Sequence, residues 1–296
     1  MTAIGWIGSG VMGAPMAGHL LAAGHELTVA TRTPEKAVPL VAEGATLVSS
    51  PAEVAQGSEA IFTMLGLPDD VRSVVLGPDG VLDAAAPGSI LVDCTTSEPG
   101  LAVEIAEAAS ERGVGAIDAP VSGGDVGARE ARLSIMVGGA DEDVERIRPL
   151  LEVMGATVVH QGPAGAGQHT KAVNQIAIAA TMVGVSEALL YARAAGLDPE
   201  TVLRSIASGA AGSWSLSNLA PRMIDGDFAP GFYVEHFVKD LGIALHGAEQ
   251  LDLQLPGLSL AAELYRRVLA DGGGRSGTQA LITTLAELNG LDWPDA

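Results

Sequence analysis

Three glycines near the start of the chain restrict its fold more than any other feature. The apolar run "AIGWIG" is typical of a buried strand, and "VMGAPMAGHLLAAG" has the spacing of a helix that ends at Gly24. Between them, "GSGVMG" supplies Gly8, Gly10 and Gly13. At a strand–turn–helix junction the first such glycine permits the tight turn, the second lets backbone approach a pyrophosphate, and the third lets helix and strand pack closely. The motif alone is weak in a chain with 38 glycines, but this context predicts a dinucleotide-binding segment.

The alternation of strands and helices continues to about residue 160. Strand-like runs follow at "ELTVAT", "ATLV", "EAIFTML", "SILVDCT", "GAIDAPV", "LSIMVGG" and "ATVVHQG", several of them separated by helical patterns. Such alternation is typical of a parallel, doubly wound α/β sheet of Rossmann type. Beyond Gly167 the pattern is helical throughout. We therefore expect a Rossmann domain over residues 1–163 and an all-α domain over 164–296, which begins with a connecting helix at 164–195.

Charge and composition exclude several classes of partner. The chain has 16 Lys and Arg against 36 Asp and Glu, a formal charge of −20, and this argues against nucleic acid and anionic membranes because both attract positive charge. Cys94 is the single cysteine, so no intrachain disulfide is possible. The N-terminal apolar run lacks the basic stretch of a signal peptide, and no run approaches about 18 uninterrupted apolar residues. We expect a soluble cytoplasmic protein, and we single out no metal ligands.

The end of the second predicted strand bears on the choice of cofactor. An NAD-binding chain usually carries an acidic residue there for the ribose 2′-hydroxyl, whereas "ATRTPEK" places Arg32 and Thr33. A guanidinium can pair with a 2′-phosphate, so NADP is favoured over NAD. The alternative is that Arg32 is simply a solvated loop residue.

Ligands of doubly wound sheets bind beyond the carboxyl ends of the strands. The first glycine loop and the strand ends at "TMLGLPDD" and "VDCTTSEPG" supply the remaining candidates for cofactor contact, which are Val11, Met12, Met64, Leu65, Thr95 and Thr96. The threonines could equally cap a helix, since their hydroxyls accept exposed N–H groups. We interpret Cys94, directly before them, as a small core residue.

A second glycine loop, "DAPVSGGDVGA", contains Ser122, Gly123 and Gly124. A hydroxyl and successive backbone N–H groups can surround a carboxylate as an anion-binding nest. Ser-Gly-Gly is also ordinary turn chemistry, and the spacing alone does not decide between the two.

The predicted connecting helix carries polar side chains on one face. In "GAGQHTKAVNQ", Lys171, Asn174 and Gln175 lie three and four residues apart, so they share a helix face. Lysine can supply a proton and a positive charge, and the carboxamides can hold a substrate oxygen. Further along, "FVKDLGIAL" places Lys239 and Asp240 on another largely apolar helix. The alternative for both helices is a solvated polar face with snorkelling lysines.

Together these stretches resemble the β-hydroxyacid dehydrogenase family, which includes 3-hydroxyisobutyrate dehydrogenase, tartronate semialdehyde reductase and the glyoxylate/succinic semialdehyde reductases. The resemblance is carried by "GWIGSGVMGAPMAGHLLAAGH", "VDCTTSEPG", "DAPVSGGDVGA…LSIMVGG", "GAGQHTKAVNQ…EALLYA" and "FVKDLGIAL" in that order. It implies a Rossmann domain, a long connecting helix and a helical domain that forms a homodimer or homotetramer. A rival is 6-phosphogluconate dehydrogenase, but the helical region here is short for that enzyme, and the sequence shows no basic cluster for a sugar phosphate.

The resemblance also implies roles for single residues. Lys171 would be the catalytic acid/base. Substrate contacts would come from Ser122, Gly123, Gly124, Asn174, Gln175 and Asp240, and cofactor contacts near the nicotinamide and ribose from Thr96 and Lys239. Many relatives repeat asparagine where this chain has Asn174 followed by Gln175, which puts the pocket shape in doubt.

The implied activity is an NAD(P)-dependent oxidoreductase reaction. Hydride would pass between nicotinamide and a small 3- or 4-hydroxy acid, or 2-hydroxy acid, and its semialdehyde or oxo acid, so the expected partner is a small carboxylate substrate. Two alternatives stay open: an imine reductase of the same fold, which usually lacks the catalytic lysine, and a non-catalytic NADP-binding module.

Overall fold

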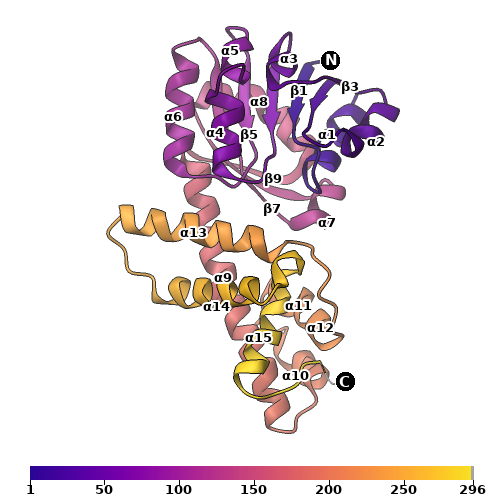
Figure 1. Ribbon diagram of the computed structural model, residues 1–296, viewed down its shortest axis with the longest axis vertical. Coiled ribbons are helices and arrows are strands. Elements are labelled where there is room, and N and C mark those ends of the chain that lie inside the picture. Colours follow the sequence, from indigo (N-terminus) through magenta and orange to yellow (C-terminus); the bar gives the residue numbers. More distant parts are fainter. Residues whose placement is uncertain (295–296) are drawn as a thin grey trace. The chain divides into compact units, whose positions relative to one another are not determined.

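A computed structural model describes residues 1–294 of the chain (Figure 1). The chain divides into two compact units, Met1–Lys171 and a second unit from Ala172 onward. The division falls inside helix α9 (Ala166–Ala194). The boundary that we predicted at residue 163 lies just before this helix begins.

The first unit is built on one β-sheet. Its strands are β1 (Ala3–Ile7), β2 (Glu26–Ala30), β3 (Thr46–Leu47), β4 (Ala60–Thr63), β5 (Ile90–Asp93), β6 (Gly115–Asp118), β7 (Val121–Ser122), β8 (Leu133–Gly138) and β9 (Gly155–Gly162). They lie in the order β3-β2-β1-β4-β5-β6-β8-β7, with β9 beside β8. All neighbours from β3 to β6 are parallel, as predicted for a Rossmann sheet.

One edge of the sheet departs from the all-parallel arrangement that the alternation suggested. Strand β8 runs antiparallel to both β6 and β7, and parallel to β9. The pairs Asp118–Gly138 and Val121–Ile135 follow one continuous register, so β7 extends β6 past Pro120. Proline has no N–H to donate to a sheet, which accounts for the break. Strands β6 and β7 therefore act as one interrupted strand beside β8.

Helices cover both faces of this sheet. They are α1 (Gly13–Ala22), the 3₁₀-helix η1 (Pro34–Ala37), α2 (Val38–Ala42), α3 (Pro51–Ala55), α4 (Pro68–Leu76), α5 (Val81–Ala84), α6 (Pro99–Ser110), α7 (Gly124–Arg129) and α8 (Asp141–Met154). Side chains of α1, α2, α7 and α8 pack in one core with Trp6 and Phe62, whereas α3 to α6 pack in the other with Ile7 and Ile61. Adjacent strand residues thus enter opposite cores, as strand geometry requires. Helices α3, α4, α5, α7 and α8 were not predicted from the sequence, although the acidic first turns of α4 and α8 are typical of helix starts.

The second unit is helical in its described part, residues 172–294, apart from one isolated bridge between Tyr233 and Gly277. After α9 come α10 (Pro199–Ile206), α11 (Trp214–Asn218), α12 (Ala220–Ile224), α13 (Val234–Gln250), α14 (Pro256–Ala270), the 3₁₀-helices η2 (Gly273–Arg275) and η3 (Thr278–Ala280), and α15 (Leu281–Leu288). Phe237 of α13 and Tyr265 of α14 meet edge to face in its core, with ring centroids 4.8 Å apart. The predicted fold class is confirmed.

Helix α9 is the longest helix among the described residues, and by length and composition alone it could cross a membrane. However, 44% of its most apolar stretch is buried inside the protein. Core helices of soluble proteins have the same composition, so this feature is weak support for a membrane span.

The first turn of α9 fits tightly against the sheet of the first unit. A Cβ on Gly167 would lie 2.4 Å from the Met136 carbonyl oxygen and 2.7 Å from the Asp118 carbonyl oxygen. A Cβ on Gly138 would lie 2.7 Å from the Gly167 backbone nitrogen, and it would also meet the Asp118 carboxyl group. Both positions therefore require glycine, because backbone atoms cannot move aside as a flexible side chain can.

We predict that Gly167→Ala lowers the free energy of unfolding by about 2 to 4 kcal/mol, because the added methyl must push helix or strand away. Gly100→Ala in the first turn of α6 is the matched control. Nothing lies within 4 Å of its Cβ position, and alanine is favoured over glycine in helices by up to about 1 kcal/mol. Urea denaturation measures both; equal stability of the two variants would contradict the close fit.

Candidate active site

The surroundings of the three glycines in the first glycine loop differ. Gly8 has φ +100°, and a Cβ there would lie 2.3 Å from the Met64 carbonyl oxygen. A Cβ on Gly13 would lie 1.9 Å from the Gly8 carbonyl oxygen. By contrast, nothing lies within 4 Å of a Cβ built on Gly10. Packing therefore explains Gly8 and Gly13, whereas the open space over Gly10 leaves room for a ligand to approach the backbone.

Helix α1 begins directly after this loop, and no side chain caps its N-terminus. The first N–H groups of a helix and its positive dipole end attract anions. Val11 is exposed and Met12 packs partly against the core. The residues present thus fit the pyrophosphate of a dinucleotide.

Arg32 and Thr33 follow the end of β2 and are exposed. The Arg32 side chain is 82% exposed, yet its guanidinium forms an ion pair with Asp70 of α4, Nη1 to Oδ1 at 3.0 Å. A second contact joins Nη2 to Oδ2 at 3.4 Å. Asp70 was not a candidate in the sequence, because nothing along the chain links α4 to the end of β2.

The carboxyl ends of β4 and β5 carry a buried polar network. Asp93 accepts hydrogen bonds through Oδ1 from the Thr63 hydroxyl at 2.7 Å and from the Thr95 N–H at 3.0 Å. The Thr95 hydroxyl in turn accepts the Leu65 N–H at 2.9 Å. This network fixes the backbone of Leu65 and of the loop that contains the half-buried Thr96.

Burial raises the pKa of Asp93 to about 6, against the lowering effect of its bonds to Thr63 and Thr95. The Asp118 carboxyl on the neighbouring strand raises that pKa further. Neither aspartate was predicted from the sequence as a site residue. Their only signal was an acidic residue at the end of each buried strand, in "LVDC" and "AIDA".

Lys171 lies in the second turn of α9 and is only 6% exposed. Its Nζ donates a hydrogen bond to the Val121 carbonyl oxygen at 2.9 Å. The alternative of a solvated, snorkelling lysine is therefore wrong. Because Val121 directly precedes Ser122, this bond ties the ammonium group to the strand that leads into the second glycine loop.

The second glycine loop turns the chain from β7 into α7. Gly123 and Gly124 have φ values of +135° and +63°, which residues with a Cβ rarely adopt. Ser122 is half-buried at the end of β7. The two positive φ values account for both glycines as turn residues, and they do not exclude a role in anion binding.

Gln168 is a further buried residue that the sequence analysis missed. It is 1% exposed, and its side chain bonds to the backbone of the loop after β5. A glutamine three residues before Lys171 carried no signal by itself, because glutamine is common on helix surfaces.

The remaining predicted residues belong to the second unit. Gln175 donates through Nε2 to Oδ2 of Asp240 at 2.6 Å and accepts from Asn174 at 2.6 Å. Lys239 pairs with Oδ1 of Asp240 at 2.9 Å, and their side chains are 16% and 1% exposed. The alternative of a solvated salt-bridging face is wrong here too. Four of the candidate residues thus form one polar cluster, in which Gln175 and Asp240 are buried and Asn174 and Lys239 are half-buried.

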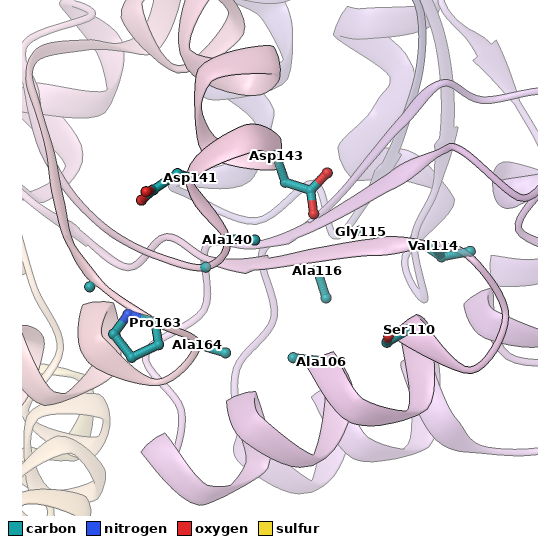
Figure 2. A pocket seen from close by; sticks show the side chains of 12 residues that line it. Ala106, Ser110, Val114, Gly115, Ala116, Ala140, Asp141, Asp143, Pro163 and Ala164 are labelled. Carbon is teal, nitrogen blue, oxygen red and sulfur yellow. The ribbon is translucent and has the colours of Figure 1, made fainter.

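A hollow of about 620 Å³ lies elsewhere on the first unit (Figure 2). It is lined mainly by glycines and alanines, with Ser110 from α6 and the carboxylates of Asp141 and Asp143 from the first turn of α8 (Figure 2). None of the predicted site residues lines it. We therefore assign the candidate active site to the strand ends and not to this hollow.

The parallel sheet, the open position at Gly10 and the uncapped helix α1 define the class of the first unit, an NAD(P)-binding Rossmann domain. Known families agree in both halves of the chain. The NAD-binding domain of 6-phosphogluconate dehydrogenase matches residues 3–162, and the NAD-binding domain of NADP-dependent 3-hydroxyisobutyrate dehydrogenase matches residues 165–285.

Relatives that match nearly the whole chain identify the family to which this protein belongs. An uncharacterized oxidoreductase of Bacillus subtilis is 54% identical over 278 residues, covering 94% of this chain and 96% of its own. A probable 3-hydroxyisobutyrate dehydrogenase-like protein of Arabidopsis thaliana is 51% identical over 291 residues, covering 98% and 87%. The structure of Mycobacterium tuberculosis 3-hydroxyisobutyrate dehydrogenase with L-serine is 33% identical, covers 96% and 99%, and superposes with a TM-score of 0.89. The chain belongs to the β-hydroxyacid dehydrogenase family of oxidoreductases.

The raised pKa of Asp93 predicts a pH dependence of stability. Its folded pKa of about 6 lies above the ordinary 3.8. The contribution of Asp93 to the free energy of unfolding is therefore fully present below pH 3.8, where the carboxyl group is protonated, and is lost as the pH rises through 6. The loss amounts to about 3 kcal/mol, at 1.36 kcal/mol per pKa unit. Asp93→Asn stays neutral and keeps an oxygen for Thr63 and Thr95. We expect its stability relative to the wild type to increase by about that amount between pH 4 and 7.5.

Urea denaturation across this pH range measures the difference. The comparison is Asp83→Asn, the same acid-to-amide change at a side chain that is 51% exposed. A flat difference for Asp93→Asn would show that Asp93 does not titrate in this range.

Proposed function

We propose that this protein is an NAD(P)-dependent dehydrogenase that interconverts a small hydroxy acid and its semialdehyde or oxo acid. The observation that carries the proposal is the buried ammonium group of Lys171. It lies 2.9 Å from the Val121 carbonyl oxygen, next to the Ser122 loop, in the unit that also carries the dinucleotide-binding glycine loop. A lysine is rarely buried unless it is paired or has a chemical task.

Lys171 is the proposed general acid and base. In the reductive direction its ammonium group gives a proton to the developing alkoxide, and in oxidation the neutral amine takes the hydroxyl proton. The Val121 carbonyl accepts one of the three N–H bonds and so fixes the direction of the group. The bound nicotinamide supplies or accepts the hydride.

The substrate class follows from the donors beside Lys171. With a net charge of −20, the protein repels small anions unless local donors capture them. The Ser122 hydroxyl and the backbone N–H groups of Gly123 and Gly124 are the proposed carboxylate site. Asn174, Gln175 and Asp240 are proposed to hold the reacting end of the substrate, with Lys239 and Thr96 on the cofactor. The relatives named for 3-hydroxyisobutyrate support a branched or small 3-hydroxy acid.

NADP is the proposed cofactor in preference to NAD. Arg32 and Thr33 follow the end of β2 directly, in place of the acidic residue that usually binds a ribose 2′-hydroxyl. Its guanidinium is exposed and held in place by Asp70, and a planar guanidinium binds phosphate through two parallel hydrogen bonds.

Lys171→Met tests the role of the ammonium group, because methionine keeps much of its length and removes its charge. We expect kcat for NADPH-dependent reduction to fall about 10² to 10⁴-fold, while NADPH binding measured by fluorescence stays unchanged. The substrates are methylmalonate semialdehyde, tartronate semialdehyde, succinic semialdehyde and glyoxylate, followed at the nicotinamide absorbance. Wild-type activity in the variant would exclude Lys171 as the proton donor. Reduction of a cyclic imine alone would favour the imine reductase alternative.

Arg32→Ala tests the choice of cofactor. We expect KM for NADPH to rise about 10 to 100-fold, because one or two charge-assisted hydrogen bonds are lost. KM for NADH should change less than about twofold. Arg72→Ala is the matched control, since Arg72 is also exposed and ion-paired on α4, with Glu104. If Arg32→Ala raised both constants equally, Arg32 would contact a part that the two cofactors share.

A further inference from the structure

We propose that Gln168 is a positioning residue for the reaction. Its carboxamide locks the turn of α9 that leads to Lys171 onto the Thr95–Ser97 loop, and so sets the distance between the proton donor and that loop. The inference rests on the proposed function, because it gives Gln168 a role only if Lys171 is the acid/base.

Both ends of the Gln168 carboxamide are engaged. Nε2 donates to the Thr95 carbonyl oxygen at 2.7 Å, and Oε1 accepts from the Ser97 N–H at 2.9 Å. These two backbone groups lie on either side of Thr96, and the bonds are buried. A carboxamide offers a donor and an acceptor at these positions at any pH, whereas an ionised carboxylate has acceptors only. Asparagine is one methylene shorter. The geometry is therefore specific for glutamine.

The backbone of the same residue is fixed from the opposite direction. Asp118, at the end of β6, accepts the Gln168 N–H through Oδ2 and the Gly165 N–H through Oδ1, both at 2.8 Å. Gln168 is thus held by its backbone to β6 and by its side chain to the loop after β5. Lys171 follows three residues later on the same helix and bonds to Val121. One helical turn therefore joins the ends of three strands.

This junction bears on catalysis because a proton donor must lie within hydrogen-bond reach of the oxygen it protonates. A lysine side chain is long and flexible, so the backbone that carries it decides where its ammonium group can reach. The Thr95–Ser97 loop also bonds to Leu65 through the Thr95 hydroxyl, which extends the junction to the end of β4. Displacement by about 1 Å can cost about 10²-fold in rate.

Gln168→Glu and Gln168→Met test the inference together. In its protonated form the introduced carboxyl group has one donor and one acceptor and reproduces both bonds, whereas the carboxylate sets an oxygen against the Thr95 carbonyl. We expect kcat of Gln168→Glu, divided by that of the wild type, to fall at least about tenfold from pH 5.5 to pH 8. The kcat of Gln168→Met should be about 10 to 100-fold below that of the wild type, and this ratio should not change across the same pH range. All values are taken per NADPH-binding site, so that misfolded protein is not counted.

The matched controls are Gln161→Glu and Gln161→Met, because Gln161 is an exposed glutamine of the same unit. Both should keep wild-type kcat at every pH. NADPH affinity of each Gln168 variant is measured beside kcat, because the carboxamide bonds to the loop that carries the candidate cofactor contacts Thr95 and Thr96, and a change in KM is thereby separated from a change in kcat.

The outcomes separate the inference from the function on which it rests. If the wild type is active and Lys171→Met is not, but both Gln168 variants keep wild-type kcat per site, the inference is wrong and the function stands. If activity falls only in proportion to the number of NADPH sites, with a pH profile parallel to the wild type, Gln168 merely supports the fold. If Lys171→Met is as active as the wild type, the proposed function itself fails.

Discussion

The candidate active site depends on how the Asp118 carboxylate receives the first turn of α9. Both of its oxygens accept backbone N–H groups at 2.8 Å, from Gly165 and Gln168. Burial raises the pKa of Asp118, while these bonds act in the opposite direction. The N-terminus of a helix offers unpaired N–H groups and a positive dipole end, so it is the partner that best stabilises a buried carboxylate. The position of Lys171, in the next turn of α9, follows from this contact.

Close packing around that contact explains residues that would otherwise look unremarkable. Gly138 and Gly167 leave no room for a Cβ, because Asp118 and the backbone of β8 fill the space. Pro120 ends the pairing of β6 and lets β7 continue towards Ser122. The ends of β5, β6 and β7 are thereby brought to the same turn of one helix. A site assembled in this way is rigid, since each part is held by bonds from separate strands.

At the same sheet edge, the glycine loop that fits a dinucleotide and the proposed proton donor Lys171 come from different elements. Gly8 and Gly13 are needed for the turn and for packing, whereas the space at Gly10 is open. The Thr63, Asp93 and Thr95 network then holds the loop backbone on the neighbouring strands. Lys171 approaches from another element altogether, on α9. In the second unit, Asp240 gathers Gln175 and Lys239 into a polar cluster of its own.

The sequence by itself determined the parts that depend on local pattern. The glycine spacing and the strand–helix alternation predicted the Rossmann sheet, the long helix and the helical second unit, because periodicity reflects which face of an element is buried. The order of five motifs was enough to identify the family.

Other features were decided only by the tertiary structure, for reasons of distance along the chain. The antiparallel β8 depends on a register between residues 118 and 138 that no local pattern records. Asp93, Asp118 and Gln168 look like ordinary polar residues in the sequence, and become structural centres only because partners up to 73 positions away meet them. The burial of Lys171 and Asp240 likewise could not be read from helical spacing, since a polar residue on an apolar helix faces solvent or a cleft according to what packs against it.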